Sequence, residues 1–146
     1  MKKFCKHIVD SQPLKILGCG GFFEDKQIRG FYADFESNQP LTKDEARLLL
    51  SHLVLNCIQE LNHDPTLFAF LNERPIDAKH ISISIGFVGT DRKPYPTLSQ
   101  IHLFESKVYY STYDSHQKTY SCNQSERFEL DTQTALIPPL SDIEIP

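Results

Sequence analysis

The sequence predicts an α+β domain built as a two-layer sandwich. One long amphipathic helix, joined by a short second helix, is expected on one face of a mostly antiparallel sheet of about six strands. Apolar and polar residues alternate with period two in residues 14–36, recur at helical spacing in residues 42–61, and return to period two after Pro75. The predicted order is strand, strand, helix and four further strands, or ββαββββ.

Residues 14–36 are predicted to form a β-hairpin. Phe31, Ala33 and Phe35 fall on one face of its second arm, and a polar loop at residues 24–27 joins the arms. The first arm is rich in glycine, which weakens a regular strand and indicates a bulge or a close approach of two backbones. These glycines are Gly18, Gly20 and Gly21.

The long helix is predicted to begin after Thr42. Thr42 is placed to cap the helix, and Glu45 follows at the spacing of a capping box. An apolar stripe then follows at helical spacing, and it needs a partner surface. It comprises Ala46, Leu49, Leu50, Leu53, Val54, Cys57, Ile58 and Leu61. Asp64 and Pro65 predict the start of the short second helix.

Four strands are predicted after Pro75. Residues 81–87 alternate most clearly, and further strands are expected around residues 98–104, 108–113 and 119–122. Their short connections favour an antiparallel meander. From Ser125 onward a helical turn near Phe128 and Leu130 is the interpretation we give to the tail.

The length of 146 residues predicts a single domain, 1–146, with flexible tails at 1–12 and 138–146. The net charge of −4 argues against a nucleic-acid partner, and no apolar run is long enough to span a membrane. Four widely spaced cysteines favour reduced thiols in the cytoplasm. No apolar segment of an export signal follows Lys2 and Lys3, so we expect a cytoplasmic protein, with export or secretion into a host as the alternative.

Three stretches carry a resemblance to a known family. They are residues 20–35, residues 41–49, and residues 71–75 together with 78–81, and they contain a glycine-bent hairpin, a helix cap and the entry to a strand. In these stretches the sequence resembles an uncharacterised family of small bacterial proteins, met mainly in species that live inside other cells. The resemblance implies a shared fold and no activity. Members of the family often begin with an export segment, and this sequence departs from them there.

Candidate site residues lie on the sheet face away from the helix and among the tyrosines of the following strand. The predicted binding residues are Tyr32, Asp34, Ser82, Ser84, His102 and Tyr110, with Tyr109, Tyr110 and Tyr113 split between the two faces. Tyrosine offers rigid contact area with a polar tip, which suits recognition. No histidine or cysteine spacing predicts a metal site, and no motif predicts a cofactor.

The sequence therefore favours a small noncatalytic binding protein of bacterial origin, one that binds a protein or a second copy of itself rather than a small molecule. An open sheet face or an unpaired sheet edge would serve as its surface. The alternative is a small hydrolase-like enzyme that uses Cys19 or a set of Asp34, Ser84 and His102, in a cleft between the 89–96 loop and the glycine-bent strand.

Overall fold

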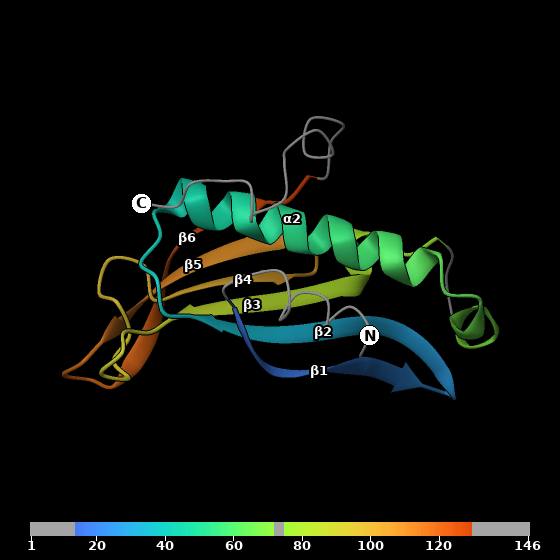
Figure 1. Cartoon of the computed structure of the whole chain (residues 1–146), viewed down its shortest axis with the longest axis horizontal. Helices are drawn as coiled ribbons and strands as arrows, with labels where there is room; N and C mark the ends of the chain where they lie inside the picture. Colours follow the sequence, from blue (N-terminus) through green and yellow to red (C-terminus); the bar gives the residue numbers. More distant parts are fainter. Residues whose placement is uncertain (1–13, 72–74, 130–146) are drawn as a thin grey trace.

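The fold is a six-stranded sheet with one long helix across one face (Figure 1). The structure, a computed structural model, describes residues 14–71 and 75–129. Its long elements are β1 (Lys15–Glu24), β2 (Gln27–Ser37), α2 (Lys43–Asn62), β3 (Ile81–Phe87), β4 (Gln100–Phe104), β5 (Lys107–Asp114) and β6 (Thr119–Arg127). Two 3-10 helices, η1 (Pro65–Phe70) and η2 (Ala78–His80), lie between α2 and β3. The α+β class, the single long helix and the mostly antiparallel sheet are confirmed.

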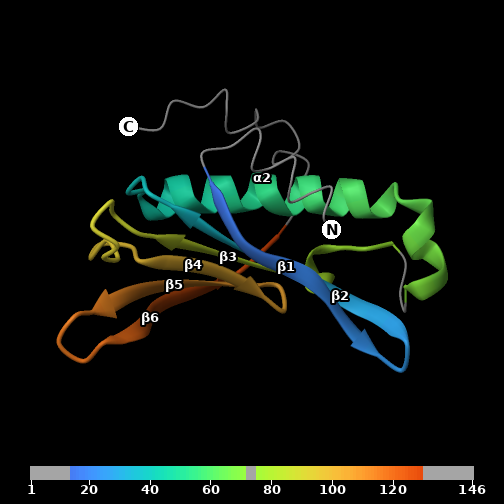
Figure 2. The same cartoon turned by 60° about the horizontal axis from the view of Figure 1, so that its bottom comes forward.

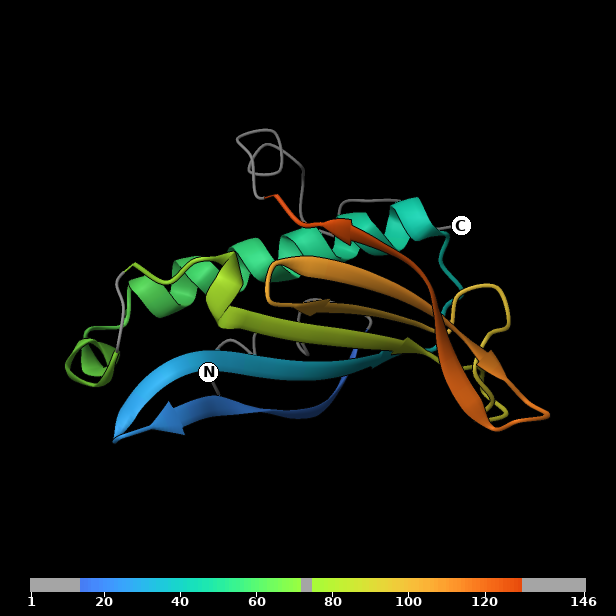
Figure 3. The ribbon, with the colours of Figure 1, turned by 180° about the vertical axis from the view of Figure 1, so that it is seen from behind.

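The strands lie side by side in the order in which they occur along the chain. Every neighbouring pair is antiparallel except β2 and β3, which are parallel. Parallel neighbours need a long crossover, and α2 provides it. Figure 2 shows α2 lying along one side of the sheet, and Figure 3 shows β6 from behind, at the edge opposite to β1.

Helix α2 begins with the predicted capping box. The Glu45 backbone N–H donates to the Thr42 hydroxyl at 3.2 Å, and the Thr42 N–H donates to the Glu45 carboxylate at 3.0 Å. These two bonds satisfy backbone donors that have no partner within the helix. The predicted second helix is the 3-10 helix η1, whose Thr66 N–H donates to the Asp64 side chain at 3.0 Å.

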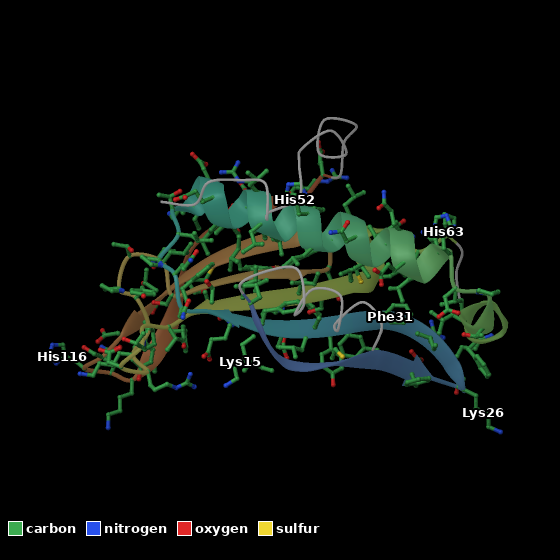
Figure 4. All side chains as sticks on the ribbon, viewed as in Figure 1. Lys15, Lys26, Phe31, His52, His63 and His116 are labelled. Carbon is green, nitrogen blue, oxygen red and sulfur yellow. The ribbon has the colours of Figure 1, made fainter. Side chains whose placement is uncertain are left out.

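The core lies between α2 and the sheet. The strands place alternate side chains against the helix, as the period-two pattern predicted. Sheet residues such as Phe31 (labelled in Figure 4), Phe35, Ile83, Ile85, Ile101 and Leu103 are buried together with the apolar stripe of α2. The burial of these apolar side chains, from the inner face of the sheet and from α2, is the main force that holds the helix on the sheet.

The end of the described chain differs from its prediction. The predicted helical turn near Phe128 is wrong, because β6 continues to Arg127 and pairs with β5 along its whole length. The N–H of Phe128, which is buried, donates to the Ser106 carbonyl at 2.8 Å. Pairing with a neighbouring strand satisfies more backbone groups here than a single helical turn could. Leu130 and the predicted tails at 1–12 and 138–146 lie outside the described residues.

Candidate functional site

The sheet face away from α2 carries a row of polar and aromatic side chains. Register places Asp34 of β2 beside Ser84 of β3, Ser84 beside His102 of β4, and His102 beside Tyr109 of β5. Tyr32 and Ser82 stand beside each other one step further along β2 and β3. All six side chains are partly buried. Four strands that are separate in sequence therefore bring five of the six predicted binding residues and Tyr109 onto one surface, which we call the open face.

Hydrogen bonds join these polar side chains in two pairs. The Ser84 hydroxyl donates to Asp34 Oδ1 at 2.7 Å. The Ser82 hydroxyl and His102 Nε2 are 3.2 Å apart, so one donates to the other according to the tautomer of the ring. Each serine is thus held by a neighbouring strand, and the two pairs lie next to each other across the sheet.

His102 is held in its neutral form. Burial lowers the pKa of its imidazole below the ordinary value of 6.5, and the nearby Asp34 carboxylate opposes that shift only in part. Its ring also contacts Phe104, at 6.0 Å between centroids, and Tyr109, at 6.5 Å. At neutral pH His102 therefore offers one donor and one acceptor, and no positive charge.

Two exposed phenylalanines stand at one end of the open face. Phe22 of β1 is 48% exposed and Phe104 of β4 is 44% exposed, and both line a cleft of about 160 Å³. The ring of Phe22 lies 5.5 Å from that of Tyr32, which in turn covers the backbone at Gly20. The other residues that line the cleft are Arg29, Gly30, Lys79, His80, Ile81, Ser82 and Glu105.

Phe22 and Phe104 were missing from the predicted binding residues. Phe104 shares the parity of His102 on its strand, and Phe22 that of Gly18 and Gly20, which lie beside Asp34 and Tyr32. Parity along each strand could therefore have indicated both phenylalanines. Their exposure depends on the neighbouring strands and could not be predicted.

Tyr110, predicted as a binding residue, lies on the opposite face. It stands beside the buried Ile101, and it is 1% exposed. Its hydroxyl donates to Glu126 Oε1 at 2.5 Å and accepts a hydrogen bond from Arg47 Nε at 3.2 Å. Burial, followed by the Glu126 hydrogen bond, raises the pKa of Tyr110 to about 12. Tyr110 thus anchors β5 and β6 to α2. The prediction of Tyr110 as an open-face residue is wrong, and its neighbour Tyr109 lies on the open face instead.

Cys19, the candidate nucleophile, does not lie on the open face. It stands beside Ala33, whose side chain is fully buried, and it packs partly buried against the core. The surrounding glycines form part of β1, with an irregularity in pairing between Ile16 and Gly18. That irregularity agrees with the predicted bulge, and Cys19 is a packing residue of the strand.

The arrangement of Asp34, Ser84 and His102 differs from that of a hydrolytic triad. In such a triad the histidine lies between the carboxylate and the serine and bonds to both. Here Asp34 bonds to Ser84 directly, and the hydrogen bond of His102 goes to Ser82. The three predicted residues are brought together, but their order of contacts is not the catalytic one.

A second cavity lies where the 89–96 loop meets the start of β1, as the predicted cleft required. It has a volume of about 520 Å³, and it is lined by Leu14, Lys15, Glu36, Asn38, Val88, Gly89, Thr90 and Arg92. Glu36 and Arg92 form an ion pair across it at 2.6 Å. Neither Cys19 nor Ser84 lines this cavity, so the two candidate nucleophiles do not meet a substrate cleft there.

Residues 14–71 and 75–129 form neither a metal site nor a membrane-spanning helix. This part of the chain contains no cluster of three His, Cys, Asp or Glu side chains placed to hold a metal ion. It also contains no helix with the length and apolar character needed to cross a bilayer. Comparison of the chain with protein-family models, with curated proteins and with solved structures found no match.

Proposed function

We propose that the protein is a noncatalytic binding protein that holds a segment of another protein against the open face of its sheet. The observation that carries this proposal is the pair of exposed rings, Phe22 and Phe104, at a small cleft. Aromatic side chains, phenylalanine among them, are enriched in protein interfaces relative to the rest of the protein surface. An apolar side chain of the partner would enter the cleft between them.

The size of the cleft favours a protein side chain over a free small molecule. Its volume of about 160 Å³ is well below the roughly 300–1,000 Å³ of ordinary small-molecule pockets. The adjoining surface can extend the contact through the Ser82 hydroxyl and the neutral ring of His102. A partner segment would thus find one apolar anchor point and a row of uncharged hydrogen-bonding groups beside it.

The test uses peptides selected by phage display against the full chain. Peptides that bind the open face should lose at least tenfold in affinity when Phe104→Ser removes the anchor ring, because central aromatic anchors contribute about 2 kcal/mol or more. Tyr120→Ser is the matched control, since Tyr120 is an aromatic residue of β6 with 51% exposure. Peptides that bind both variants as tightly as the wild type would refute the open face as the binding surface.

The hydrolase alternative has one observation in its favour, the hydrogen-bonded pair of Ser82 and His102. A neutral imidazole beside a hydroxyl can act as a general base. A fluorophosphonate probe tests this directly: labelling of Ser82 in the wild type, and its loss in His102→Gln, would establish a nucleophilic serine. We expect no labelling, because the Asp34 carboxylate is bonded to Ser84 instead of His102.

We further propose that this is a cytoplasmic protein of bacterial origin, with secretion into a host as the alternative. The cysteines in the described part of the chain, Cys19, Cys57 and Cys122, are free thiols. Free thiols persist in reducing compartments. Fractionation of cells that express the full chain should find it in the cytoplasmic fraction, and its recovery from the medium would support secretion.

A further inference from the structure

The outer edge of β1 carries an unusual concentration of exposed apolar side chains. In the described part of the chain, six large apolar side chains are strongly exposed: Leu17, Phe22, Phe23, Phe70, Phe104 and Tyr120. Three of these six belong to the single strand β1, including Phe23, which is 68% exposed. Strand β1 is also the end of the sheet order, so no described strand pairs with its outer side. An exposed apolar edge strand is a template for pairing with another strand.

The charges of β1 are arranged so that the strand complements itself. Lys15 stands at its start and Asp25 follows its end in the turn, whereas Glu24, its last residue, is paired with Arg29 at 2.8 Å. Two copies of β1 that run antiparallel about a two-fold axis bring Lys15 of each copy towards Asp25 of the other. Such an arrangement repeats each contact twice, as in other two-fold symmetric dimers.

One register satisfies the side chains as well as the charges. With the two-fold axis at Gly20, Lys15 and Leu17, which lie on the far side of or within the irregularity of β1, come near Asp25 and Phe23 of the second copy. The same register places Phe22 opposite Gly18. Both belong to the open side of β1, because Gly18 stands beside Asp34 and the ring of Phe22 touches that of Tyr32. Residues directly opposite in an antiparallel pair share a face, so the pair of Phe22 and Gly18 fits this register.

The space at Gly18 fits this register. A Cβ built on Gly18 would have no other atom within 4 Å, so the surface there is open. By contrast, Gly20 is already covered by the ring of Tyr32, whose nearest carbon would lie 2.9 Å from a Cβ. An aromatic ring laid across a strand glycine covers its exposed backbone. Tyr32 does this within the chain, and Phe22 of a second copy would do it at Gly18.

We propose that the protein forms a two-fold symmetric dimer through antiparallel pairing of its β1 strands, which joins the two sheets into one. This inference goes beyond the proposed binding of a partner on the open face, because it uses the strand edge and a second copy of the same chain; Phe22 takes part in both surfaces. Backbone hydrogen bonds supply the pairing and the side chains of Leu17, Phe22 and Phe23 fix the register.

The test is the oligomeric state of the full chain over a range of concentrations, measured by sedimentation velocity. The wild type should shift from the 16.8 kDa monomer to twice that mass as concentration rises. Leu17→Lys should raise the dissociation constant at least about a hundredfold, because each of the two symmetric contacts loses about one tenfold step of apolar burial. Tyr120→Lys, the matched change on β6, should leave dimerisation unchanged.

Crosslinking tests the register. In the double variant Gly18→Cys, Phe22→Cys, mild oxidation should join position 18 of one copy to position 22 of the other, as peptide mapping would show. Gly18→Cys, Tyr120→Cys should give no link between its two new thiols. Circular dichroism confirms folding of each variant, and Phe23→Lys replaces Leu17→Lys if the latter unfolds.

Three results would overturn the proposal. They are a wild type that stays monomeric at every concentration, a dimer that survives Leu17→Lys and Phe23→Lys, and resistance to hydrogen exchange, in dilute monomer, of the β1 amides that point away from β2. The last result would mean that another segment of the same chain covers the edge. Phe104→Ser separates this test from that of the open face, because it should weaken peptide binding at least tenfold and leave the dimer intact.

Discussion

The two edges of the sheet, β1 and β6, show opposite chemistry. All residues of β6 except Glu126 are exposed, and most of them are polar. It is attached to α2 by a hydrogen bond from Lys43 to Gln124 at 2.9 Å and by an ion pair between Arg47 and Glu126 at 3.1 Å. β1 instead packs Ile16 and Cys19 against the core and leaves its larger apolar side chains in water.

This difference shows how each edge avoids or invites pairing. A polar edge strand with a bulge is a poor template for another strand, and β6 has an irregularity in its pairing beside Tyr110 and Ser111. β1 also has irregular positions, yet its exposed side chains are apolar. The chain thus protects one edge with polar residues and leaves the other suited to a partner.

Loss of the Tyr110 ring should have the largest effect, and it should affect the β6 edge. Tyr110→Ala should lower the free energy of unfolding by about 3–5 kcal/mol, since a fully buried aromatic ring is removed. Tyr110→Phe, the control, keeps the ring and should cost only about 1–2 kcal/mol through the lost hydroxyl bonds to Arg47 and Glu126. Urea denaturation measures both, and equal losses would show that the ring is not the main anchor.

Two glycines of the β1 hairpin should respond differently to the same change. A Cβ at Gly30 would lie 2.9 Å from the His80 carbonyl oxygen, which belongs to the backbone and cannot turn aside. Gly30→Ala should therefore destabilise the fold by about 1–3 kcal/mol. Gly18→Ala should be neutral or stabilising by up to about 1 kcal/mol, because its surroundings are open and alanine is less flexible. Thermal unfolding at fixed low concentration compares them, and a matching loss at both sites would contradict this account.

The free energy of unfolding should fall in mild acid, because two histidines that lie away from both edges become protonated. Burial lowers the pKa of His52 and of His102, and the buried Nε2 of His52 has no hydrogen-bond partner in the described part of the chain. Because both pKa values are lower in the folded chain, the unfolded chain takes up protons first as the pH falls through about 6.5. Their contribution is complete above that pH and declines below it.

Single substitutions test whether His52 and His102 cause this pH dependence. His102→Gln and His52→Gln should each flatten the dependence of unfolding free energy on pH between about 7 and 5. Lys43→Ala, which changes no histidine, is the control and should keep the wild-type slope. A slope that is unchanged in both histidine variants would show that other groups control the acid response.

The smallest effects should come from the ion pairs near each edge. Arg29 and Glu24, at the end of the β1 hairpin, are 2.8 Å apart and largely exposed. Arg29→Ala should cost roughly 0.2–1 kcal/mol, as exposed pairs do. Arg47→Ala should cost more, about 1–2 kcal/mol, because Arg47 also donates to the hydroxyl of the buried Tyr110. Urea denaturation ranks them, and the reverse order would contradict the stronger attachment of β6.

Much of the fold could be predicted because its signals are local. The cap at Thr42 and Glu45, the apolar stripe of α2 and the alternation of residues 81–87 each depend on neighbours within a few positions. The end of β6 could not be predicted from residues 125–128, since it depends on pairing with β5. Short polar segments have weak local preferences, and a neighbouring strand overrides them.

The sequence predicted which residues form the candidate site better than it predicted the contacts between them. Parity along the strands correctly placed Asp34, Ser84 and His102 on one face. The hydrogen-bond partners depend on the register of the strands. In this register Asp34 bonds to Ser84, and His102 bonds to Ser82. The choice between Tyr109 and Tyr110 was equally open, because adjacent tyrosines satisfy either face of a strand.

The sequence by itself determined the layers of this protein, since the period of its apolar residues specifies a helix or a strand and the face that must be buried. Only the tertiary structure decided that β2 and β3 run parallel, and that β1 and β6 lie at the two edges. These features arise from contacts between residues far apart in the chain. They also separate an apolar edge that invites a partner from a polar edge that does not.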